Sequence, residues 1–218
     1  METLRRRLPG GSAGNEHLTA VVAAILVVLL AVEGATLLGI ESLLTVHVFV
    51  GVLLVPVVGL KLASTGWRMA RYYLGGEEYV RRGPPHGLLR TVVAPFVVLS
   101  TVTLLATGLL LLGLGETAGP LLALHQASFA VWLGATGVHV LAHLAKLPRL
   151  LRARAPGAAL RGAVVACTLV AGVSLATVTL PAADHLQNRV TAHVGIDGTS
   201  AERAGSGYGI GISAPTIT

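Results

Sequence analysis

Cysteine and charge are both scarce in this chain of 218 residues. Cys167 is the one cysteine, which excludes an intrachain disulfide and any multi-cysteine metal cluster. Charged residues make up 12% of the chain and hydrophobic residues 53%, and the mean hydropathy is +0.75. These values lie outside the range of soluble globular proteins and indicate an integral membrane protein.

Nucleotide-binding motifs and the zinc-protease motif are also missing. The chain has no G-x-x-x-x-G-K-[ST] loop and no Rossmann fingerprint. The segment HVLAH at 139–143 has metal-ligand spacing but lacks the glutamate of the zinc-protease motif H-E-x-x-H. We therefore expect this chain to carry out no covalent chemistry of its own.

Apolar runs long enough to cross a bilayer occur five times. A helix rises about 1.5 Å per residue, so about 20 apolar residues span the hydrocarbon core. The chain is thus predicted to be all-α, an integral membrane helical bundle of five transmembrane helices. The runs are residues 18–40, 43–64, 88–113, 121–147 and 162–180.

The predicted organisation has four parts. A cytoplasmic N-terminus (1–17) precedes a four-helix membrane domain (18–147). A basic cytoplasmic loop and the fifth helix follow at 148–181, where Pro181 is expected to end the helix. The remainder, 182–218, is rich in Gly, Ser, Thr and Ala and is expected to be a flexible external tail.

Lysine and arginine lie almost entirely on one side of the predicted membrane. Fourteen of the 16 fall in the N-terminus, the 61–90 segment and the 146–161 segment. By the positive-inside rule that side is cytoplasmic, so the N-terminus is cytoplasmic and the C-terminus external in a cell inner (plasma) membrane. The net charge of +6 is therefore explained by topology rather than by nucleic-acid binding.

Two histidines have matching depths near the external side. His47 and His125 each lie about one and a half turns inside the external end of their span. An ionisable side chain in a membrane must face a partner or a cofactor, and one haem plane fits between these two. Two axial imidazoles leave no open position for oxygen, which suits electron transfer. Gly51, one turn after His47, leaves room for the macrocycle.

The cytoplasmic side has more candidates than one site needs. His139 lies 14 residues after His125, about 21 Å along the helix axis and about 40° around it, and His143 follows one turn later. His17 opens the first span and His86 precedes the third. A second haem would use two of these histidines, and the depth of His17 fits His143 as well as His139.

These histidines resemble the pattern of the di-haem membrane cytochrome b family, which includes bacterial b561-type cytochromes and the membrane subunits of formate dehydrogenases and hydrogenases. In that family one ligand comes from the first helix, one from the second, and two, 14 residues apart, from the fourth. His17, His47, His125 and His139 occupy those places. The resemblance covers residues 15 to 147 and implies two haems b that carry electrons between quinone and a partner redox protein.

Three further polar side chains lie within the spans. Glu33 has nearly the depth of His47 and is expected to hydrogen-bond a ligand's second ring nitrogen, to carry protons, or to bond a neighbouring helix. Lys61 is expected to extend to the membrane interface or to neutralise a haem propionate. Trp132 is expected either to pack between haems or to serve helix packing.

The predicted function is that of a membrane b-type cytochrome, the electron-transfer subunit of an oxidoreductase rather than a stand-alone enzyme. One alternative is a non-haem membrane protein, such as a transporter component or assembly factor, whose histidines form interhelical hydrogen bonds. Another is an intramembrane metal-binding protein that uses His139 and His143. Membrane lipid, quinone and a redox partner subunit are the expected partners.

Overall fold

The computed structural model describes residues 11–80, 94–152 and 156–206. Every regular element in these residues is helical, as predicted. The long helices are α2 (Gly11–Thr36), α3 (Ile40–Tyr73), α5 (Ala94–Leu114), α6 (Pro120–Leu144) and α8 (Ala158–Ser206). The short ones are the 3-10 turn η1 (Leu37–Gly39), α4 (Glu77–Val80) and α7 (Leu147–Arg152).

The long helices are apolar enough to cross a membrane. Gly11–Tyr73 forms one apolar region of 63 residues, and α5, α6 and the first 35 residues of α8 form three more. A straight helix of 63 residues would extend about 95 Å, far more than a bilayer. The chain instead reverses at η1, where Gly39 leaves the helical conformation with φ −149° and ψ 47°. The protein is thus an all-α, multi-pass membrane bundle.

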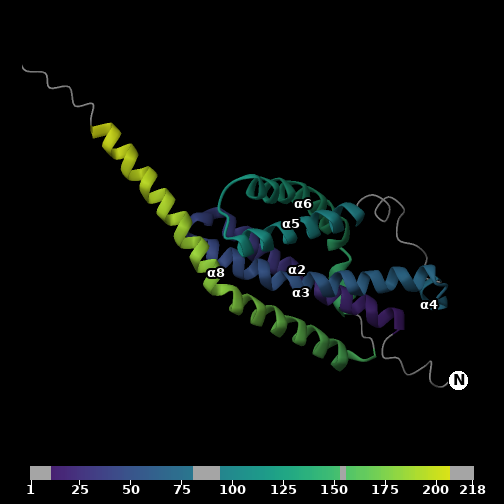
Figure 1. Ribbon diagram of the computed structural model, residues 1–218. Helices are drawn as coiled ribbons and strands as arrows, with labels where there is room; N and C mark the ends of the chain where they lie inside the picture. The colour runs from purple at the N-terminus through teal and green to yellow at the C-terminus, as the bar shows by residue number, and fades with distance from the viewer. Residues whose placement is uncertain (1–10, 81–93, 153–155, 207–218) are drawn as a thin grey trace, which may run out of the picture.

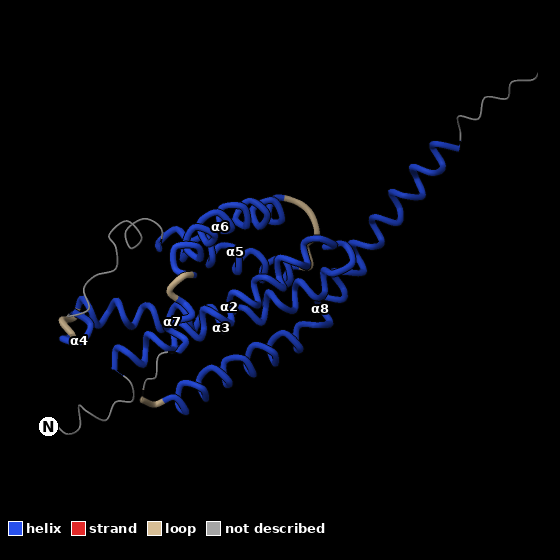
Figure 2. Tube along the Cα trace, turned by 180° about the vertical axis from the view of Figure 1, so that it is seen from behind, coloured by secondary structure: helices blue, strands red, loops and turns tan. Residues whose placement is uncertain are grey.

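The helices lie in three groups. The antiparallel α2 and α3 form the centre, the α5–α6 hairpin covers one side of them, and α8 runs along the other (Figure 1). The view from behind shows the same order (Figure 2). We call the end that holds η1 and the α5–α6 connection the turn end. The end at which α2 and α8 begin is called the basic end, because Lys146, Arg149 and Arg152 lie there.

Helix α3 connects these groups. It packs against α2, α5 and α8, whereas α6 packs closely only against α5 and α7 among the described elements. Many side chains of α6 are correspondingly exposed on the protein surface, and Ser128 is the one buried residue of this helix. The buried apolar core is therefore built around α3. Its members are Val22 of α2, Val52, Leu53 and Val57 of α3, Leu112 of α5, and Ala176, Ala183 and Leu186 of α8.

A glycine allows α8 to approach α3 closely. A Cβ atom at Gly172 would lie 2.9 Å from the carbonyl oxygen of Leu53 and 3.2 Å from the Pro56 ring. Ala176, one turn later, is completely buried. Small residues one turn apart let two membrane helices pack backbone to backbone, and this packing replaces the hydrophobic effect that is absent in lipid.

The end of the fifth helix differs from the prediction. The sequence predicted that the helix stops at Pro181 and that a tail without regular structure follows, but α8 continues through Pro181 to Ser206. The helix bends along its course and its far end projects from the bundle (Figure 1). An internal proline removes one helical hydrogen bond and bends a helix, which other contacts can compensate. Residues 207–218 lie outside the described residues.

Contacts beyond Pro181 supply that compensation. Ala183 and Leu186 are buried in the core. The Thr45 hydroxyl donates to Asp184 at 3.0 Å, and the Arg189 guanidinium donates to the carbonyl oxygen of Gly115 at 2.5 Å. This part of α8 is therefore tied to both α3 and the α5–α6 connection at the turn end.

Replacing Gly172 by alanine tests the α3–α8 contact. The added Cβ overlaps the Leu53 carbonyl group, so we expect Gly172→Ala to destabilise the protein by about 1–3 kcal/mol. Gly162→Ala on the same helix meets nothing within 4 Å and should be neutral or stabilising by up to about 1 kcal/mol. Thermal unfolding in detergent micelles measures both. Equal midpoints for the two variants would contradict the close approach.

Candidate functional site

His47 of α3 lies against the end of α2. Its Nδ1 atom is 2.9 Å from the hydroxyl oxygen of Thr36 and 3.1 Å from Oε1 of Glu33. The Thr36 hydroxyl itself donates to the carbonyl oxygen of Glu33 at 2.6 Å. The imidazole is held mainly by the helix that precedes it in the hairpin, and its side chain is 20% exposed.

His125 of α6 has the same relation to α5. Its Nδ1 atom is 3.0 Å from the hydroxyl oxygen of Thr107. That hydroxyl donates back to its own helix, with the carbonyl oxygens of Thr103 and Leu104 at 2.8 and 3.0 Å. Each hairpin therefore presents one histidine, and a threonine of the preceding helix supports it.

These hydrogen bonds determine the tautomer of both rings. A hydroxyl group has one proton, and both Thr36 and Thr107 donate theirs to a backbone carbonyl oxygen. Each hydroxyl is then left to accept from the histidine, which favours the tautomer with hydrogen on Nδ1, although at His47 the Glu33 carboxyl group contacts the same nitrogen. The Nε2 atom of each ring keeps its lone pair, which is the form that coordinates a metal.

An electrostatic interaction links the two histidines. His47 lies near enough to His125 for a charge on one ring to act on the other, although they come from different hairpins. Both residues are half-buried. The two rings thus lie within electrostatic range of each other, and no hydrogen bond between them is found in the described residues.

Two glycines lie beside these rings. A Cβ atom at Gly108 would be 3.2 Å from Cε1 of His125, which is too close for an unstrained contact. A Cβ atom at Gly51 would be 3.4 Å from Oε1 of Glu33. The absence of a side chain at both positions keeps space free beside the imidazole of His125 and beside the carboxyl group that contacts His47.

Glu33 contacts one ring nitrogen of His47 on the neighbouring helix, which fits both the bond to a histidine ring and the interhelical bond among the sequence alternatives. Its second oxygen, Oε2, is buried and has no hydrogen-bond partner among the described residues. A carboxyl group on the far nitrogen of an imidazole orients the ring and raises its basicity as a ligand.

The histidines of the basic end are arranged differently. The rings of His139 and His143 stack with centroids 4.6 Å apart, and Nδ1 of His143 bonds the carbonyl oxygen of His139 at 2.9 Å. Nδ1 of His139 is buried without a partner in the described part of the chain. No hydrogen bond or ring contact joins His17 to another described residue, and His86 lies outside the described residues.

Two further predicted positions have defined partners. The ammonium group of Lys61 donates to the carbonyl oxygen of Thr19 in α2 at 2.9 Å, so it binds inside the bundle instead of extending to water. The indole nitrogen of Trp132 donates to the hydroxyl oxygen of Thr101 in α5 at 3.0 Å. This hydrogen bond favours the helix-packing interpretation of Trp132.

Sequence reasoning did not single out Thr36, Thr107 or Gly108. A threonine in an apolar helix usually satisfies its own hydroxyl by bonding the preceding turn, so it gives no signal of a partner. The sequence does offer one signal for these pairs, namely the distance of each residue from the turn that joins its two helices. Thr36 and His47 lie on either side of η1, and Thr107 and His125 on either side of the α5–α6 connection, where antiparallel helices place residues opposite each other.

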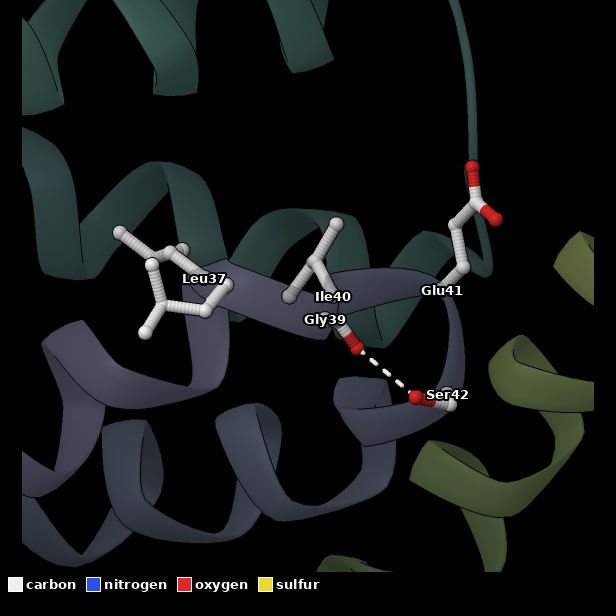
Figure 3. A pocket seen from close by; sticks show the side chains of 6 residues that line it. Leu37, Gly39, Ile40, Glu41 and Ser42 are labelled. Carbon is white, nitrogen blue, oxygen red and sulfur yellow. Dashed lines mark hydrogen bonds between the residues drawn. The ribbon is translucent and has the colours of Figure 1, made fainter.

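The hollow drawn in Figure 3 is separate from this site. Its lining is the consecutive segment Leu37–Ser42, in which the Ser42 hydroxyl donates to the carbonyl oxygen of Gly39 at 3.1 Å. It is an open depression on the tip of the α2–α3 hairpin. Within the described residues no three His, Cys, Asp or Glu side chains gather as a group that could hold a metal ion.

Comparisons with protein-family models, with curated proteins and with solved structures gave no match.

Removing the Thr107 hydroxyl tests the tautomer argument. In protein made by cell-free synthesis without added cofactor, we expect His125 to carry its proton on Nδ1. Thr107→Val removes the acceptor, so the proton should move to Nε2, while Thr107→Ser should keep it on Nδ1. Solid-state NMR of ¹⁵N-histidine protein distinguishes the two nitrogens. An unchanged Nδ1–H in Thr107→Val would show that the hydroxyl does not set the tautomer.

Proposed function

We propose that this protein is a membrane b-type cytochrome whose turn-end haem is held by His47 and His125. One observation carries the proposal. Two histidines from separate hairpins lie near each other, and a threonine hydroxyl accepts the Nδ1 proton of each. Both Nε2 lone pairs are thereby available, and haem iron needs two such ligands, one on each axial face.

The surrounding residues fit a haem. Gly51 and Gly108 leave space where a Cβ atom would approach the Glu33 carboxyl group or His125. Helix α6 has no close packing with α3 among the described elements, so the side chains between the two hairpins determine their separation. A macrocycle must lie between helices, and small residues beside the axial ligands favour that placement.

When bound, the haem supplies a one-electron carrier. Two axial imidazoles occupy both faces of the iron, so no position is left for oxygen or substrate, and this favours electron transfer over oxygen chemistry. We therefore propose a role as the electron-transfer subunit of an oxidoreductase, between quinone or quinol and a redox partner protein.

The supporting residues have defined tasks in this proposal. Thr36 and Thr107 hold the rings in the ligating tautomer and limit their rotation. Glu33 adds a carboxyl group at Nδ1 of His47, where it helps to orient the ring. The two ligands are thus inequivalent, because His47 has a carboxyl group beside it, whereas His125 has the Thr107 hydroxyl and a hydrogen bond to the backbone of Leu104.

At the basic end the proposal extends to a second haem on His139 and His17, as the resemblance implies, with His143 and His86 as the other candidate ligands. His139 and His143 are together on α6, and α2, which carries His17, packs against α7 at this end. The distribution of lysine and arginine supports a cytoplasmic location for the basic end, in a plasma membrane.

Substitution of the two proposed ligands tests the function. We expect His47→Ala and His125→Ala each to remove the turn-end haem, since one imidazole alone binds haem weakly and leaves the iron open. The measurement is haem per chain as the pyridine haemochrome, with a reduced-minus-oxidised visible spectrum. His185→Ala is the matched control, because His185 is an exposed histidine of α8 at the same end.

The outcomes separate the proposal from its alternatives. Wild-type protein and His185→Ala should hold the same amount of haem b, and each ligand variant should lose one haem per chain. Two haems in the wild type would place the second at the basic end. Absence of haem from the wild type after expression with haem supplied would contradict the proposal and favour histidines that serve only as interhelical hydrogen bonds.

A further inference from the structure

One segment of α8 contacts both hairpins that carry the proposed haem ligands. Along most of its course α8 lies on the side of α2 and α3 that is opposite to the α5–α6 hairpin. At the turn end it bends and meets the α5–α6 connection (Figures 1 and 2). Pro181 lies just before this contact, and an internal proline bends a helix. We call residues 184–189 of α8 the brace segment.

On α3 the brace segment binds the turn of helix that precedes His47. The Thr45 hydroxyl donates to Asp184 at 3.0 Å, and the Thr45 backbone nitrogen donates to Oε1 of Gln187 at 3.3 Å. The side-chain nitrogen of Gln187 donates in turn to the carbonyl oxygen of Glu41. Thr45 is two residues from His47, so the brace segment is attached to α3 close to the first proposed ligand.

On the other hairpin, Arg189 binds the α5–α6 connection. Its guanidinium group donates to the carbonyl oxygen of Gly115, the residue that directly follows α5, at 2.5 Å. Gly115 has φ +68°, and a Cβ atom there would lie 3.4 Å from Nη1 of Arg189. Glycine thus permits the left-handed turn at the end of α5 and leaves room for the guanidinium group.

The position of His125 depends on this connection. His125 lies in the second turn of α6, which begins at Pro120. Among the described elements α6 packs against α5 and α7, and α7 lies at the basic end. At the turn end α6 is therefore held by α5 and by the connection that Arg189 binds. Axial ligation requires both imidazoles within about 0.5 Å of the productive geometry, so the separation of the two hairpins has to be fixed.

We propose that the brace segment positions His125 relative to His47, with Arg189 as the positioning residue. It fixes the α5–α6 connection at a set distance from α3, through Arg189 at one end and through Asp184 and Gln187 at the other. The purpose assigned to this spacing, haem ligation, rests on the proposed function. The spacing itself is a property of the helices and can be measured without a haem.

A distance between the hairpins tests the brace segment directly. Spin labels are placed at Leu38→Cys in η1 and Leu124→Cys in α6, two exposed positions, in protein whose exposed Cys167 is replaced by serine. Pulsed electron paramagnetic resonance then gives the distribution of distances between the labels. We expect Arg189→Gln to broaden this distribution towards longer distances.

Two further arginine variants complete this test. Arg189→Lys keeps the charge and an N–H donor and should restore the wild-type distribution. Arg161→Gln is the matched control, because Arg161 is an arginine of the same helix whose guanidinium group donates to the carbonyl oxygen of Pro156 at the opposite end. It should leave the distribution unchanged.

Haem binding tests the consequence for the ligands. Since the Arg189 contact is exposed, we expect Arg189→Gln to weaken haem binding at the turn end by about two- to tenfold, the ordinary worth of one hydrogen bond. Haemin titration of protein made by cell-free synthesis measures this affinity. The low-spin ferric signal of the variant should also shift and broaden, because it depends on the orientation of the two rings. Arg189→Lys should reverse both changes.

The results separate this inference from the proposed function. A distance distribution for Arg189→Gln that matches the wild type would overturn the inference, whatever the haem content. A broadened distribution with unchanged haem affinity and an unchanged ferric signal would also overturn it, because the connection would then move without moving His125. Absence of haem from the wild type would contradict the proposed function, and the distance measurement alone would then decide whether the brace segment sets the spacing.

Discussion

The hydrogen bond from a histidine Nδ1 atom to a threonine hydroxyl is the interaction on which the proposed site depends. It occurs in both hairpins, at 2.9 Å for His47 with Thr36 and at 3.0 Å for His125 with Thr107. In each case the hydroxyl proton is already given to a backbone carbonyl oxygen, which favours a histidine that donates from Nδ1. Without this arrangement either ring nitrogen could carry the proton. With it, both Nε2 atoms are free to bind a metal.

Helix α3 makes this geometry possible, because it both carries His47 and holds the bundle together. Gly172 lets α8 approach its backbone closely, and the contacts of Asp184 and Arg189 keep the turn end in place beyond Pro181. The firm packing of α3 on α2 and α8 contrasts with the sparse packing of α6. The helix that carries His47 thus packs against more neighbours than the helix that carries His125, and in the proposed site a large planar group would lie between them.

The elements of the fold were largely predictable, because apolar runs of about 20 residues in lipid can satisfy their backbone only as helices. The similar depth of Glu33 and His47 could be predicted, whereas their direct contact was only one of several alternatives. The continuation of α8 did not follow, because Pro181 is a local signal for helix termination and the opposing contacts of Asp184 and Arg189 are distant in sequence. The threonine partners were also missed, since the register between two helices depends on turn geometry that composition does not reveal.

Electron paramagnetic resonance of the purified, oxidised protein tests the central claim most directly, because the spin state of ferric haem reports its axial ligands. Two imidazoles give a strong ligand field. The account therefore predicts a low-spin ferric signal of bis-histidine type, with at least one such haem per chain, and its loss in His47→Ala. A high-spin ferric signal in the wild-type protein would mean an open axial position, and the absence of any haem signal would mean no haem. Either result would contradict the claim that His47 and His125 ligate one haem.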